Sequence, residues 1–476
     1  MYYNTNQDLA VLNLTMRVNF TLPRSRSRSR ASILLSLNAV LFQFQFKQIH
    51  SFQIAASDAQ QHHRRQRDAE ISHSFATRDF EPAWYATNPH LQTIVGVFAR
   101  HETSYASNLK ALLNKSFFQE DDPSAHPIKS FQWDERVRMI TQDGDFFDVD
   151  YNYVDKNKSK STRNNNNNNY EDEEKEEVRP LVLIVHGLQS NSDSPLVKDM
   201  TNAFNAIGMD AACINFRGCS GEINKATPLG YHLSFTDDLQ QMVEHISQTF
   251  PMRPIYLSGF SLGANVVTKF LADIGTDANK KYNICGAAVN AVPFDLVKVA
   301  PNLSDPGFTK IVYGNSLCQS LKGRTQEMNI GACEEQGLFS NKAFEAVETI
   351  REYDDLVVCS FYADFDNVLD YYAKSSTWSI LDQVSVPQLI VQALDDPFFQ
   401  GNIKPENDPS MPLRIHYTKH GGHCGYVFQS DKGQHCQTSW MPTEMARFLD
   451  HVHQEQQQTS STWTANNDLL VTVKSN

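Results

Sequence analysis

PIYLSGFSLGANVV, residues 254–267, carries the most specific structural pattern in this chain. The apolar residues 255–257 predict a buried strand, and residues 264–271 follow with the apolar spacing of a helix. Between them stands Gly-x-Ser-x-Gly, which in a strand–turn–helix context raises a serine hydroxyl above the end of a sheet. Gly259 and Gly263 leave room for the tight turn that this requires. The stretch therefore predicts a nucleophilic Ser261, with a chance occurrence of the five-residue pattern as the alternative.

Short apolar runs alternate with helical stretches on both sides of this segment. The runs cover residues 181–185, 211–215, 255–257, 286–290, 387–392 and 413–417. Several are apolar throughout, as the strands of a parallel sheet covered on both faces must be. The alternation predicts an α/β fold with a mostly parallel, doubly wound sheet. From about residue 294 to 384 the pattern is interrupted by mostly helical sequence, which predicts a helical lid over the strand ends.

The predicted domain extends from residue 80 to 455 and begins with less regular sequence. Pro82, Trp84 and Pro89 suggest an irregular arm, and residues 136–141 and 146–154 predict a β-hairpin around Asp143-Gly144. Residues 155–178 contain six consecutive asparagines and an acidic run, which predict a low-complexity loop that is too polar to pack. Residues 456–476 are expected to form a C-terminal tail.

Residues 1–79 are expected to be a targeting or disordered extension. No Asp or Glu occurs from residue 9 to 57, where a basic Arg-Ser repeat precedes the apolar residues 33–42. This composition fits an organellar transit peptide, and equally a signal peptide or an anchor that associates with a membrane. A disordered extension is the third alternative. The expected location is organellar or endomembrane-associated, with a cytoplasmic location as the runner-up.

Composition excludes some classes of function. The 476 residues carry a formal net charge of -13, whereas a general nucleic-acid-binding protein needs a basic face. The eight cysteines include no Cys-x-x-Cys pair and no Cys/His spacing suited to zinc, so neither a metal nor a cofactor is expected. No apolar run reaches the eighteen or so residues of a membrane-spanning helix.

A nucleophilic serine needs a general base and an acid that orients it. The last-but-one strand ends at Asp395-Asp396, and the last strand is followed by a glycine-marked loop that contains His420 and His423. His423 is the expected base because two glycines precede it and let the loop fold back toward Ser261. The spacing from the strand favours Asp396 slightly, but either aspartate remains a candidate for the acid.

Two backbone N–H groups are the expected donors to the oxyanion. One belongs to Leu262, after the nucleophile, and the other to Leu188, in the loop after the first parallel strand. A separate pattern, His232-x-x-x-x-Asp237, has a spacing associated with some acyltransferases, but a capping box starting at Ser234 would explain the same residues.

These motifs together resemble the YheT-like branch of the α/β-hydrolase superfamily, which includes animal hydrolase-domain lipases and the yeast medium-chain ethyl-ester synthases. The matching stretches are NPHLQT at 88–93, HGL at 186–188, NFRGCSGE at 215–222, GFSLGAN at 259–265, DDPF at 395–398 and HGGHCGY at 420–426. The resemblance covers roughly residues 80–450. It implies an α/β-hydrolase fold with a triad of Ser261, one of Asp395 and Asp396, and His423.

The predicted function is a serine carboxylic-ester hydrolase, an esterase or lipase that acts on lipid or medium-chain acyl esters through an acyl-enzyme. The alternatives are an acyltransferase that uses an alcohol in place of water, and a non-catalytic binding protein of the same fold. The expected partner is a small-molecule acyl ester or lipid. Six phenylalanines in or beside the lid segment would either line an acyl pocket or form ordinary core; they are Phe294, Phe308, Phe339, Phe344, Phe361 and Phe365.

Overall fold

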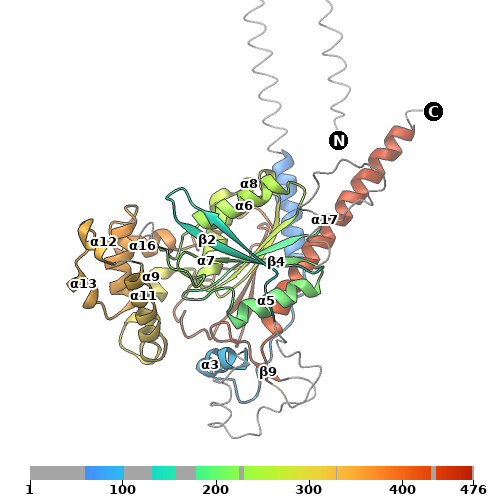
Figure 1. Cartoon of the computed structure of the whole chain (residues 1–476). Helices are drawn as coiled ribbons and strands as arrows, with labels where there is room; N and C mark the ends of the chain where they lie inside the picture. Colours follow the sequence, from blue (N-terminus) through green and yellow to red (C-terminus); the bar gives the residue numbers. More distant parts are fainter. Residues whose placement is uncertain are drawn as a thin grey trace, which may run out of the picture. The chain divides into compact units, whose positions relative to one another are not determined.

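The structure is a computed structural model that describes residues 59–100, 131–155, 178–224, 230–328, 330–429 and 436–473 (Figure 1). The chain divides into two compact units, residues 1–62 and residues 63–476. The fold and the site described below belong to the second unit.

An eight-stranded sheet forms the centre of this unit, with the strand order β1-β2-β4-β3-β5-β6-β7-β8. β1 and β2 form the antiparallel hairpin, β2 is antiparallel to β4, and every other neighbouring pair is parallel. The predicted mostly parallel α/β sheet is therefore confirmed. The strands are β1 Glu135–Ile140, β2 Phe146–Asn152, β3 Leu181–Val185, β4 Asp210–Asn215, β5 Ile255–Phe260, β6 Ile284–Asn290, β7 Gln388–Ala393 and β8 Leu413–Thr418.

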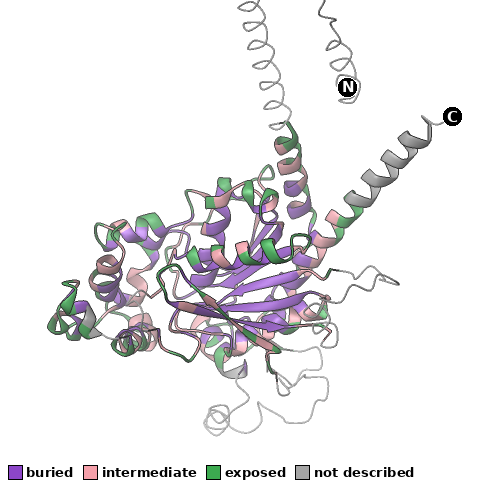
Figure 2. Cartoon of the chain, turned by 45° about the horizontal axis from the view of Figure 1, so that its top comes forward, coloured by how far each residue is buried: buried purple, intermediate pink, exposed green. Residues whose placement is uncertain are grey.

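Most residues of the central strands are apolar, because these strands are buried on both faces. In β3, Leu181, Leu183 and Val185 join one core, while Val182 and Ile184 join the other. Successive side chains of a strand point to opposite faces, so a strand covered on both sides has no solvent-facing position. Figure 2 shows this burial across the middle of the sheet.

Helices cover both faces of the sheet. The first core contains residues of α6 Asp237–Thr249, α7 Leu262–Ile274 and α8 Asp277–Lys280. The second contains residues of α5 Pro195–Ala206 and of the long C-terminal helix α17 Trp440–Val473. This doubly wound arrangement places the carboxyl ends of the parallel strands at one edge, where the loops that follow them meet.

The segment between β6 and β7 forms a helical cap with an apolar core of its own (Figure 1). Two of its turns, η2 and η3, are π-helical. The elements of the cap are α9 Leu296–Val299, α10 Pro301–Ser304, η2 Lys310–Gly314, α11 Asn315–Glu327, α12 Ile330–Glu335, α13 Asn341–Glu345, α14 Ile350–Tyr353, η3 Asp354–Val358, α15 Cys359–Phe361, α16 Val368–Ser375 and η4 Leu381–Gln383.

The structure corrects the predicted N-terminal boundary at residue 80. Residues 63–74 are helical, and Ile71 and Phe75 are buried in the core that α17 completes. The Ser72 hydroxyl donates to the Pro412 carbonyl at 2.7 Å. Residues 63–79 are therefore part of the folded domain. Their sequence is polar overall, but its few apolar side chains are buried in the core.

Two further segments differ from expectation. The predicted irregular arm becomes regular at Pro89, where α3 Pro89–Arg100 begins, because proline is well suited to the first position of a helix. The predicted C-terminal tail is largely helical, since α17 continues to Val473.

Two predictions concern residues outside those that the structure describes. They are the targeting or membrane-anchoring role of residues 1–58 and the low-complexity loop, of which residues 156–177 are not described. Among the described ranges, no helix is both long and apolar enough to cross a membrane.

Candidate active site

Ser261 lies in a strained turn between β5 and α7. Its backbone has φ 55° and ψ −122°, a conformation that residues with a side chain rarely adopt. A Cβ atom at Gly259 would lie 2.8 Å from the backbone of Gly263, and one at Gly263 would meet the carbonyl oxygens of Val185 and His186. Only glycine fits at these two positions, which is why the turn can be this tight.

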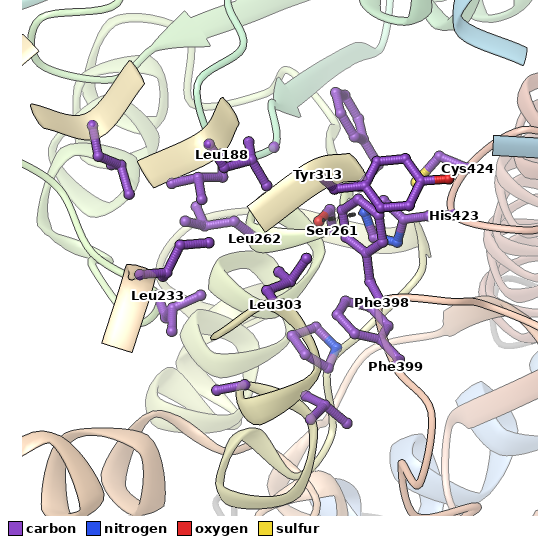
Figure 3. Close-up of a pocket in the computed structure, with 18 of the residues that line it drawn as sticks. Leu188, Leu233, Ser261, Leu262, Leu303, Tyr313, Phe398, Phe399, His423 and Cys424 are labelled. Atoms are coloured by element: carbon purple, nitrogen blue, oxygen red, sulfur yellow. Dashed lines mark hydrogen bonds between the residues drawn. The ribbon is translucent and has the colours of Figure 1, made fainter. Parts of the chain in front are cut away.

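Three of the predicted residues form a hydrogen-bonded chain, of which Figure 3 shows Ser261 and His423. Ser261 Oγ lies 2.9 Å from His423 Nε2, and His423 Nδ1 lies 2.8 Å from Asp396 Oδ2. The other oxygen of Asp396 accepts the Phe398 N–H at 2.8 Å, so the carboxylate is held at both ends. With Nδ1 protonated toward Asp396, Nε2 is free to accept a proton from the serine.

Asp395, the alternative acid, lies against a different histidine. Its carboxylate pairs with His420 Nδ1 at 3.2 Å and accepts the Gly422 N–H at 3.0 Å. Burial raises the pKa of the Asp395 carboxyl, against the opposing effect of these contacts. Asp395 and His420 therefore shape the loop that carries His423, and neither reaches Ser261 through a hydrogen bond.

The His423 ring is fixed by contacts that sequence reasoning missed. Phe398 stacks on it with ring centroids 4.0 Å apart, and Phe399 meets it edge-on at 5.1 Å. From α3, Thr93 Oγ1 accepts the His423 N–H at 2.9 Å, and Arg100 donates to the carbonyls of residues 424 and 425. Thr93 belongs to the stretch NPHLQT, residues 88–93, which the sequence analysis used only for the family resemblance.

The two expected oxyanion donors both lie beside the serine. The N–H groups of Leu188 and Leu262 have no hydrogen-bond partner among the described residues, and both leucines line the cavity that contains Ser261. A Cβ atom at Gly187 would lie 2.9 Å from the Phe260 ring, so glycine lets this loop approach the nucleophile closely. Donors that are already in place can stabilise a developing negative charge without rearrangement.

The cap holds the loop that carries Leu188. The backbone N–H of Gln189, a residue with φ 57°, donates to the Tyr231 hydroxyl at 2.9 Å. From α11, Arg324 donates to the same hydroxyl at 3.2 Å, and Ser320 donates to the Gln189 side chain at 3.0 Å. The position of α11 and the conformation of this loop are thus linked through Tyr231.

A cavity of about 710 Å³ opens next to Ser261 and extends into the cap (Figure 3). Its wall is mostly aliphatic and includes Leu188, Leu233, Leu262, Leu296, Val299, Leu303, Leu317, Leu321, Ile350 and Val358. None of the six phenylalanines considered as pocket residues lines it. Phe294, Phe339 and Phe344 are buried core, and Phe361 and Phe365 pack against the core of the cap, so the core interpretation holds for these five. Phe308 is largely exposed and belongs to neither the pocket nor the core.

Two other histidines near the site are held neutral by burial. Burial lowers the pKa of His186 to about 4 and that of His232 to about 3. His232 packs against Tyr362 and Phe365, and the predicted capping box at Ser234 does not form: the N-cap of α6 is Thr236, with no side-chain bond. Ser234 instead bonds to Ser375 at 2.7 Å, because the cap offers a closer partner.

No group of side chains suited to a metal ion occurs among the residues that the structure describes. The geometry of the site itself is better defined. The site contains a serine in a strained turn, a base within hydrogen-bonding distance, an acid that orients the base and two free N–H donors, which together suit nucleophilic attack on a carbonyl.

The sheet order, the serine turn and the cap inserted after β6 define the chain as an α/β-hydrolase. A family model described as serine aminopeptidase, S33 (Hydrolase_4), matches residues 176–401, which include Ser261 and Asp396 but end before His423. The chain is similar to the YheT-like branch of this superfamily: it is 29% identical over 251 residues to YheT of Escherichia coli (strain K12), a match that covers 52% of the chain and 71% of that protein.

Two yeast proteins are also similar. Saccharomyces cerevisiae monoacylglycerol lipase is 27% identical over 284 residues, covering 59% of the chain and 61% of the relative. Medium-chain fatty acid ethyl ester synthase/esterase 2 of the same organism is 26% identical over 293 residues, covering 57% and 62%. The similarity thus spans about three fifths of the length of these yeast proteins.

Proposed function

We propose that this protein is a serine carboxylic-ester hydrolase that acts on lipid or medium-chain acyl esters through an acyl-enzyme. The observation that carries the proposal is the hydrogen-bonded chain of Ser261, His423 and Asp396 at the edge of a large apolar cavity. A cavity with mostly aliphatic walls suits an acyl chain, and the polar groups are concentrated where a bond would be cleaved. The names of the two yeast relatives agree with this substrate class.

In the proposed reaction, Ser261 Oγ attacks the ester carbonyl while His423 Nε2 accepts the serine proton. The carbonyl oxygen becomes negative and is held by the N–H groups of Leu188 and Leu262. The bond to the alcohol breaks, and His423 returns the proton to the departing oxygen. Water, deprotonated by the same histidine, then attacks the acyl-enzyme and releases the acid and free serine.

The test is hydrolysis of p-nitrophenyl esters of increasing acyl length by the full chain. We expect the Ser261→Ala variant to lose at least about a thousandfold in kcat/KM. Ser258→Ala is a matched control in the same segment, because that hydroxyl is buried and donates to the Ala288 carbonyl; it should keep activity. A folded protein that hydrolyses no ester, or activity that survives Ser261→Ala, would contradict the proposal.

Acyl transfer to an alcohol is the second candidate, and the yeast relative named a synthase/esterase is the observation that favours it. The two reactions share the acyl-enzyme and differ only in what attacks it. Adding ethanol to the assay and measuring the ratio of ethyl ester to free acid separates them: transfer predicts mainly ester, hydrolysis mainly acid. A purely binding role is disfavoured, because binding does not require the three side chains to be hydrogen-bonded in series.

A further inference from the structure

One acidic side chain lies in the cap part of the cavity, away from the triad in the sequence and in the fold. Asp354 is the first residue of the π-helical turn η3, and it lines the same cavity as Ser261. Only 6% of its surface is exposed. π-helical turns are rare and occur frequently at functional sites. The walls around it are mostly aliphatic, so this carboxyl is an exception that needs an explanation.

The hydrogen bonds of Asp354 leave one oxygen available. Oδ2 accepts the Tyr372 hydroxyl at 2.8 Å. Oδ1 has no hydrogen-bond partner among the described residues. This oxygen is not fully enclosed by the protein, so a bound group can reach it. Because Asp354 is buried and lines the cavity, Oδ1 is the oxygen that remains for a group bound there.

The charge of Asp354 is not balanced by the protein. No Lys, Arg or His among the described residues forms an ion pair with it, and its sequence neighbour Asp355 is also acidic. Burial therefore raises the pKa of Asp354 to about 7. A buried carboxyl with an unused oxygen reduces stability unless another group satisfies it.

We propose that Asp354 recognises a hydroxyl group carried on the apolar chain of the substrate. A hydroxyl can donate to the free Oδ1 while the rest of the chain lies along the aliphatic wall. A neutral partner suits this position because the carboxyl is buried in the wall of a mostly apolar cavity. This proposal rests on the proposed ester hydrolysis, because the bound molecule is a substrate only if the protein hydrolyses esters. Binding itself can be measured without turnover.

A site that hydrogen-bonds one group of its ligand discriminates against the analogue that lacks it, because the buried partner is then left unsatisfied. The proposal therefore predicts a preference for a hydroxylated chain at the chain length that reaches Asp354. A purely structural role, in which Asp354 only fixes α16 through Tyr372, predicts no such preference.

The test is calorimetric binding of matched methyl esters to the full chain carrying Ser261→Ala, which prevents turnover. Each pair has the same straight chain, with or without a hydroxyl at its far end, over a series of lengths. We expect the hydroxylated ester to bind at least about tenfold more tightly at one length. Adding Asp354→Leu should abolish this preference, and Asp354→Asn, which keeps the shape of the side chain, should weaken it.

Tyr372→Phe is the control for a structural role, since it removes the hydroxyl that bonds to Asp354 and leaves the carboxyl in place. The preference should survive in this variant. Equal binding of both esters at every length, or no binding of either, overturns the proposal. Tighter binding of an ester that ends in an ammonium group overturns the assignment of a hydroxyl. The proposed ester hydrolysis is tested separately, by measuring the turnover of esters without a hydroxyl by the parent protein.

Discussion

Asp395 and Asp396 are adjacent in the chain, yet their carboxylates contact different histidines. Asp396 reaches His423, and Asp395 reaches His420. The sequence could place both aspartates at the end of a strand, but it could not decide between them. The decision depends on which way each side chain points, and that direction is set by contacts with a loop more than twenty residues later in the chain.

At the residue scale, we therefore expect opposite outcomes from two similar substitutions. Asp396→Asn should lower kcat/KM by about a thousand- to ten-thousandfold, because the amide favours the wrong tautomer of His423. Asp395→Asn should lower it by less than about tenfold, because it changes only the support of the loop. Ester hydrolysis by the two folded variants is the measurement. Equal losses would contradict the assignment of Asp396.

Because His232 is buried in its neutral form, we expect the free energy of unfolding to fall in mild acid. Its pKa is about 3 in the folded protein and ordinarily about 6.5, so the folded state binds fewer protons than the unfolded state below pH 6.5. The domain is therefore most stable above pH 6.5, where His232 is neutral in both states, and its free energy of unfolding decreases as the pH falls below 6.5. At pH 5 the loss is about 2 kcal/mol.

The measurement is urea unfolding at pH 7 and pH 5. His232→Phe, which suits the aromatic neighbours and cannot be protonated, should lose less stability between the two pH values than the parent. The same pH dependence in both proteins would show that His232 is not held neutral.

At the element scale, the cap and the oxyanion loop are connected through Tyr231, whose hydroxyl joins Gln189 to Arg324. Tyr231→Phe removes these bonds and keeps the ring, which stacks on Phe216 at 4.6 Å. We expect kcat to fall by about tenfold with little change in KM. That is less than the roughly hundredfold to thousandfold typical of losing an oxyanion donor outright. A rise in KM with unchanged kcat would instead indicate a role in substrate binding.

The elements with strong local patterns were predictable, and those held by distant contacts were not. The central strands of the sheet are short, largely apolar runs, and the hairpin has Asp143-Gly144 at its turn, with Gly144 at φ 81°. Residues 63–74 were missed because the face that they bury includes Asp68 and Ser72, so the helical pattern is weak by hydrophobicity alone. Their hydrogen-bond partners include residues 412 and 451, which are far away in the sequence.

At the scale of the whole molecule, the N-terminal helix and α17 complete one face of the domain. Phe75 meets Phe448 with ring centroids 5.3 Å apart, and Arg78 forms an ion pair with the buried Glu444 at 2.7 Å. Removing residues 63–79 would expose apolar surface of α17 and leave a buried carboxylate without this partner.

This contact predicts different results for two truncations. A chain that lacks residues 1–62 should keep its thermal stability and its activity. A chain that lacks residues 1–79 should melt several degrees lower or be recovered only in the insoluble fraction. Thermal melting of both, followed by circular dichroism, is the measurement. Equal melting temperatures would mean that residues 63–79 do not stabilise the domain.

Labelling with a fluorophosphonate shows whether Ser261 is an activated nucleophile, because the probe reacts with such serines. The full chain is incubated with the probe beside Ser261→Ala and His423→Ala, and the labelled peptide is identified by mass spectrometry. The account predicts a single adduct on Ser261, absent from the serine variant and strongly reduced in the histidine variant. A folded parent protein that does not react, or equal labelling of Ser261→Ala, would contradict it.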